Sequence, residues 1–158
     1  MEKLIEQYRY HDQLYKIVLE GIKPEHTHVR LNGMTNQIFW IVGNLPTTQY
    51  KITNGMDIEL QQAFYDFHGR NRGIISDAEY PSHVEIIKDG NKIALVLEER
   101  LQELTDEDLT CESLFNSLKI IHNNLLRTLS FIIDREAYAI VQPILMRKAF
   151  AYEAMKYS

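Results

Sequence analysis

Hydrophobic residues recur at spacings of three and four along most of the chain, which is the period of an α-helix that buries one face. In the first segment this face carries Leu4, Tyr8, His11, Tyr15, Val18 and Ile22. Gly21 and Pro24 then predict the end of the first helix. A second helix is predicted to start between Asn32 and Thr35 and to run toward Tyr50, with Pro46 as a kink or a break.

Residues 54–81 predict a long connection, because glycines and Pro81 alternate there with polar residues. Such connections usually carry a short helix or a function. The run from Leu60 to Phe67 is the candidate for a short helix, and His68 with the Gly-Arg-Asn-Arg-Gly stretch is expected at an exposed end.

Residues 82–104 fit two structures. Asp89-Gly90 between two apolar runs resembles the turn of a β-hairpin. Against this, Ser82 and Glu85 have the spacing of a capping box, and the apolar residues from Val84 to Leu104 fit one helical face. The longer pattern favours a helix, in which Gly90 would cost about 1 kcal/mol.

The residues Thr105 to Asp108 are read as a polar break, and 112–152 as a short helix followed by a long one. Pro143 lies inside this last helix and should bend it. Helices in this number and order, with a long middle connection, predict an all-α fold. Residues 1–158 are expected to form a single four-helix bundle domain with short extra helices in its connections.

Two stretches of the chain share the pattern of a known family. The stretch from Thr35 to Leu45 reads TNQIFWIVGNL and resembles Asn-x-Ile-x-Trp-x-x-Gly-His-Leu, the second-helix pattern of the DinB/YfiT-like four-helix bundles. The stretch from Arg135 to Gln142 reads REAYAIVQ and resembles the last-helix pattern His-Glu-(Ala/Ser)-Tyr-His-x-Gly-Gln of the same bundles. The chain therefore resembles a divergent member of this family.

The resemblance implies a site in which three histidines hold a divalent metal ion. It also implies relatives that are transferases or isomerases dependent on a thiol such as bacillithiol, mycothiol or glutathione. The matching positions here are Asn44, Arg135 and Ala139. Alanine offers no ligand, and asparagine is a weak ligand for zinc. A guanidinium about 4 Å from a divalent ion would repel it by roughly 8 kcal/mol at an effective dielectric near 20. We therefore expect no metal and no other cofactor at this site.

The vacated position suggests a different use. Three roles of Arg135 are open. It forms an internal ion pair with Asp134, Glu136 or another carboxylate, it lines a pocket for an anionic small molecule with Asn44, Tyr138 and Ala139, or it is exposed to solvent. The expected function is a non-catalytic small-molecule-binding or interaction protein, without catalytic residues. The alternative is a metal- or thiol-dependent transferase of the DinB/YfiT type with relocated ligands, such as His11, His68 or His122.

The remaining reactive side chains point to no other chemistry. His26 and His28 are expected on a solvated turn, and His11 in the core. Cys111 is the only cysteine and lies between acidic residues, which disfavours a nucleophilic thiolate.

Composition and charge disfavour three classes of protein, namely nucleic-acid-binding, membrane-spanning and secreted proteins. The net charge is −5, with basic residues scattered along the chain, so nucleic-acid binding is not expected. There is no apolar run of the length that a membrane span needs, and the N-terminus lacks a secretion signal, so the expected location is the cytoplasm. Aromatic clusters at helical spacing would fill a core or the interface of a homodimer.

Overall fold

The computed structural model describes residues 1–52, 66, 68, 79–113 and 124–156. The regular elements of this part are all helices, and the only β contact in it is an isolated bridge between Glu112 and Asn124. The helices are α1 (Glu2–Leu19), α2 (Pro24–Thr27), α3 (Ile38–Ile52), α5 (His83–Glu103), α6 (Asp106–Thr110) and α7 (Leu125–Ala149). The predicted all-α class is confirmed.

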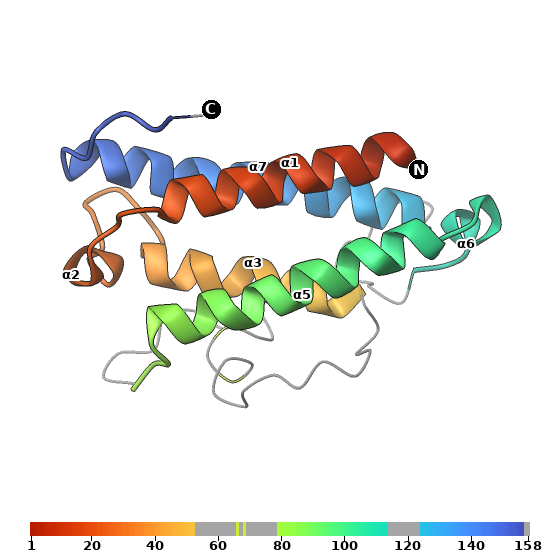
Figure 1. The fold of residues 1–158 in the computed structure, drawn as a ribbon, viewed down its shortest axis with the longest axis horizontal. Coiled ribbons are helices and arrows are strands. Elements are labelled where there is room, and N and C mark those ends of the chain that lie inside the picture. Colours follow the sequence, from red (N-terminus) through yellow and green to blue (C-terminus); the bar gives the residue numbers. More distant parts are fainter. Residues whose placement is uncertain (53–65, 67, 69–78, 114–123, 157–158) are drawn as a thin grey trace.

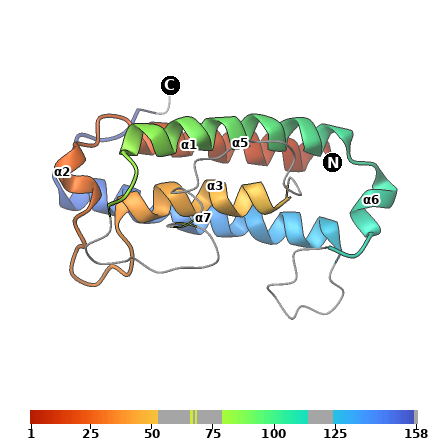
Figure 2. The ribbon, with the colours of Figure 1, turned by 90° about the horizontal axis from the view of Figure 1, so that it is seen from below.

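The long helices α1, α3, α5 and α7 lie side by side along the molecule (Figure 1). Each packs against two others: α3 against α5 and α7, and α1 against α7 and α5. Figure 2, turned by 90°, shows α1 and α5 in one layer and α3 and α7 in the other. α1 and α7 run in one direction and α3 and α5 in the opposite one.

Buried apolar side chains fill the space between these helices in three groups. One end of the core contains Leu19, Ile22, Ile38, Phe39, Val42, Ile86, Ile93 and Met146. The other end contains Tyr8, Leu97, Leu101, Leu104, Leu109, Leu129 and Ile132. A third group, Val18, Ile41, Leu45 and Ile140, joins α1, α3 and α7. The apolar faces that the sequence spacing predicted thus meet in one interior.

The segment after Pro81 is a helix, as the longer pattern favoured. The Ser82 side chain accepts a hydrogen bond from the Glu85 backbone N–H, and the Glu85 carboxylate accepts one from the Ser82 N–H, so the predicted capping box is present. Gly90 lies inside α5, and a Cβ placed there would come within 3.0 Å of the Pro46 ring of α3. The glycine therefore permits the close approach of α3 and α5, which offsets its low helix propensity.

Two predicted boundaries were wrong. The second helix begins at Ile38 and not between Asn32 and Thr35, because the chain first makes a turn closed by a hydrogen bond from the Met34 N–H to the Leu31 carbonyl. The supposed polar break at Thr105 starts the short helix α6, since Thr105 and Asp108 form a capping box of their own.

The two prolines that were discussed as possible kinks or breaks both lie inside helices. Pro46 is within α3, so the helix continues past it, and Pro143 is within α7 as predicted. The candidate short helix at 60–67 lies outside the described residues except for Asp66, which is helical. The short helix expected at the start of 112–152 falls mostly in 114–123, which is also outside them.

His68 is not at an exposed end, as the sequence had suggested. Its side chain is fully buried, and its ring packs near those of Phe39 and Tyr80, with centroids 5.5 and 5.9 Å away. Gly43 of α3 lies directly beneath it: a Cβ built at Gly43 would stand 2.3 Å from the ring carbon Cγ. The imidazole of His68 occupies the space that a side chain at position 43 would fill.

Candidate functional site

The two stretches that carry the family resemblance meet where α3 and α7 pack against each other. Arg135 of α7 donates a hydrogen bond from Nη2 to Oδ1 of Asn44 on α3, over 2.6 Å, although 91 positions separate the two residues. Arg135 also donates from Nη1 to the hydroxyl of Thr48, one turn beyond Asn44. The Asn44 amide in turn donates to the carbonyl of His68 over 3.5 Å. We call Arg135, Asn44 and Thr48 the arginine site.

Both described partners of Arg135 are neutral. Asn44 and Thr48 are buried, with 7% and 5% of their surface exposed, and Arg135 itself is half-buried. None of the ion pairs in the described part of the chain includes Arg135. Burial lowers the pKa of Arg135, and the nearby Glu136 carboxylate opposes that shift. Of the roles considered for Arg135, the internal ion pair is therefore not seen among the described residues, where an amide and a hydroxyl are its partners.

The other two residues of the predicted pocket lie in different surroundings. Ala139 is half-buried, next to the apolar group that includes Leu45 and Ile140. Tyr138 is 73% exposed on the outer side of α7. The structure thus brings Asn44 and Arg135 into direct contact, places Ala139 at the same helix interface, and leaves Tyr138 in solvent.

A second polar group lies on the buried side of α7. Glu136 is only 2% exposed, and its Oε1 accepts a hydrogen bond of 2.8 Å from the Gln49 amide of α3. Its other oxygen, Oε2, is 3.5 Å from Nδ1 of His11 on α1. Those two atoms and the Tyr8 hydroxyl have no hydrogen-bond partner within the described ranges. Burial, and then the charge of Glu136, raise the pKa of Tyr8 well above its usual value.

A small cavity of about 20 Å³ adjoins this buried group. Side chains from all four long helices line it, among them His11, Asp12, Gln49, Asn91 and Glu136. A cavity of this size holds about one water molecule, and its polar walls would hydrogen-bond to it. The space is too small for an organic ligand.

The candidate relocated ligands do not form a cluster in the part of the chain that the structure describes. His11 faces Glu136 across the core, His68 packs on Gly43, and His122 lies outside the described residues. Within the described ranges, no three His, Cys, Asp or Glu side chains are placed to hold one metal ion.

His28 is exposed and lies on a turn, as expected, and its ring stacks on Phe39. His26 does not lie on a solvated turn. It belongs to α2 (Pro24–Thr27), and its half-buried ring stacks on Phe150 at 4.3 Å and hydrogen-bonds the Tyr152 hydroxyl. Both rings therefore have structural contacts. Cys111 is exposed and is a free thiol.

Sequence reasoning missed Thr48, Gln49 and the burial of Glu136. Thr48 lies four residues after Asn44 and so shares its helical face, a signal that the spacing already contained. Glu136 falls on the apolar stripe of α7 between Ile132 and Ile140. That spacing could have identified Glu136 as buried, although carboxylates are rarely found in cores.

No family model matches the chain, and no curated protein matches it. In the part of the chain that the structure describes, no helix combines the length and the apolar character that a membrane span requires.

Proposed function

We propose that the chain is a divergent DinB/YfiT-like four-helix bundle in which an arginine has taken the place of the metal site. The resemblance aligns Asn44 and Arg135 with two ligands of a single metal ion, which requires them to be neighbours in space. The support is their direct hydrogen bond across 91 positions of sequence. The four long helices around one core agree with the same architecture.

On this proposal the protein is a non-catalytic small-molecule-binding or interaction protein, and the arginine site recognises an anion. The observation that carries this is the half-buried guanidinium with two neutral partners in the described part. A guanidinium has five N–H donors, and these two bonds use two of them. A carboxylate or phosphate group would accept the remaining donors in pairs and supply the missing negative charge.

Isothermal titration with succinate and with inorganic phosphate, in a buffer of low ionic strength, tests this proposal. We expect at least one probe to bind the wild type, and Arg135→Gln to weaken that binding tenfold or more by removing the charge. Arg127→Gln is the matched control, because it makes the same change at an exposed position of α7. Its affinity should equal that of the wild type.

Two results would refute the anion site. In the first, neither probe binds the wild type. In the second, a probe binds Arg135→Gln and the wild type equally well. Circular dichroism of each variant shows whether the helices are intact, so that lost binding is not confused with lost structure.

The alternative, a metal- or thiol-dependent transferase of the DinB/YfiT type, needs three ligands from other positions. His11 and Glu136 lie together, but no third such group joins them among the described residues. Stoichiometric metal in the purified protein would favour this alternative over the arginine site.

A further inference from the structure

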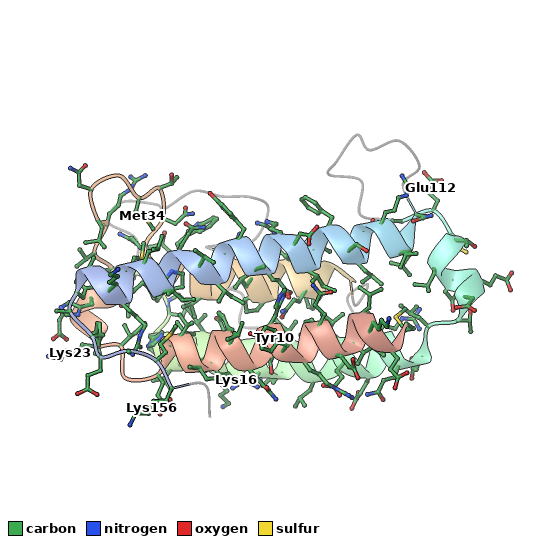
Figure 3. The ribbon with its side chains drawn as sticks, turned by 90° about the horizontal axis from the view of Figure 1, so that it is seen from above. Tyr10, Lys16, Lys23, Met34, Glu112 and Lys156 are labelled. Carbon is green, nitrogen blue, oxygen red and sulfur yellow. The ribbon has the colours of Figure 1, made fainter. Side chains whose placement is uncertain are left out.

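Helix α7 carries an exposed apolar stripe on the side opposite to its buried face. Tyr138, Val141 and Leu145 are 73%, 49% and 52% exposed. Their spacings of three and four residues place them on one line along the helix. α7 forms one edge of the helical core in Figures 2 and 3, and the exposures of the three side chains show that their side of the helix faces solvent.

A residue of opposite charge lies at each end of the stripe. Asp134 lies seven residues before Val141 and Lys148 seven residues after it, and both are exposed. Seven residues make about two helical turns, so both charges lie on the line of the stripe. Neither side chain has an ion-pair partner among the described residues.

We propose that the stripe binds the same stripe of a second copy, with the two α7 helices antiparallel and the twofold axis at Val141. A twofold interface must be self-complementary. If one residue contacts a second residue on the other copy, the twofold rotation makes the second residue contact the first in the same way. Here the rotation sets Asp134 opposite Lys148 of the second copy, and Tyr138 opposite Ile144, one position before Leu145. A parallel pairing would set like charges against each other, which is unfavourable. The proposal stands on the order of residues in α7 and does not depend on the arginine site.

The exposed apolar residues of α5 do not form such a surface. Val84 and Leu95 are 75% and 66% exposed, but eleven positions separate them. The exposed residues between them are polar and include Lys88 and Lys92. These residues are therefore suitable sites for control substitutions.

The expected affinity follows from the size of the stripe. From Asp134 to Lys148 the helix rises about 21 Å. Two helices in contact over this length bury roughly 1,000 Å² in total, at the lower limit for a specific interface. We therefore expect a dimer that dissociates in the micromolar range.

Charge reversal combined with sedimentation equilibrium tests both the surface and its direction. Asp134→Lys should weaken the dimer at least tenfold, because Lys148 of the second copy then faces a lysine, and Lys148→Asp should do the same. Asp134→Lys combined with Lys148→Asp should restore association, since the pairs are re-formed with exchanged signs. Leu95→Ser on α5 should leave association unchanged.

The proposal is overturned if the wild type stays monomeric up to about 200 µM, where a micromolar dimer must form. It is also overturned if the double reversal associates no better than the single ones. Val141→Cys in a Cys111→Ser background gives a second readout under mild oxidation. The two sulfurs at the axis should form a disulfide between copies, whereas Leu95→Cys in the same background should not. Equal cross-linking of the two variants contradicts the proposed axis.

Discussion

Gly43→Ala should destabilise the protein by about 3 kcal/mol, at the upper end of the usual effect of overpacking. The added Cβ would lie 2.3 to 2.4 Å from three atoms of the buried His68 ring, so either the ring or α3 must move. Urea denaturation measures the loss as a lower midpoint at an unchanged slope. The same substitution would cost little in an open helix, because alanine is the better helix former.

A double-mutant cycle assigns this effect to the ring. His68→Ala alone should also destabilise, since it leaves a cavity in the core. In that background, however, Gly43→Ala should cost less than about 0.5 kcal/mol, because the clashing atoms are gone. If the free energy of unfolding of Gly43→Ala is within about 0.5 kcal/mol of the wild-type value, His68 does not pack closely against α3 at Gly43.

His68 should also make the protein sensitive to acid. Burial lowers the pKa of its ring from 6.5 to about 4, and a hydrogen bond with the backbone of Trp40 offsets part of that shift. As the pH falls through 6.5 the unfolded chain binds a proton at this ring, whereas the folded protein does so only near pH 4. The free energy of unfolding should therefore keep its full value above pH 6.5. It should decrease by about 3 kcal/mol as the pH falls to 4, since one pKa unit corresponds to about 1.4 kcal/mol.

The comparison is with His68→Leu, which removes the ionisable ring and retains an apolar side chain. Its free energy of unfolding should fall less steeply between pH 6.5 and 4. The half-buried His83 has a pKa shifted in the same direction, but it is present in both proteins and so cancels in the comparison. Should the variant fold poorly, an NMR titration of the wild-type His68 ring replaces it. A midpoint near 6.5 in the folded protein would contradict the burial of this ring.

The sequence predicted helices best where local signals and periodicity agreed. In α5 the capping box at Ser82 and the long apolar face outweighed the turn signal of Asp89-Gly90. Both of those residues are buried within the helix, Asp89 at 3% exposure. In α6 the local signal was present at Thr105 and Asp108, but four polar residues in succession were taken as a loop. A helix of five residues forms there because its first turn is capped and Leu109 is buried.

The contact between positions 44 and 135 was accessible from the sequence only through the family pattern, because no local rule joins residues 91 positions apart. The pattern ends at Leu45 and so could not supply Thr48, the second partner of Arg135. The burial of His68 was unpredictable for a similar reason: the space it occupies comes from Gly43, in another helix.

The replacement of the metal site is tested most directly by measuring metal after incubation with zinc or nickel and dialysis, for the untagged wild type and for one triple variant. The variant restores the family's histidines through Asn44→His, Arg135→His and Ala139→His. We predict no stoichiometric metal in the wild type and about one zinc ion per chain in the variant, because three converging imidazoles bind zinc. Stoichiometric metal in the wild type would contradict the replaced metal site. A folded triple variant that holds no metal would contradict the convergence of these three positions, and with it the family resemblance.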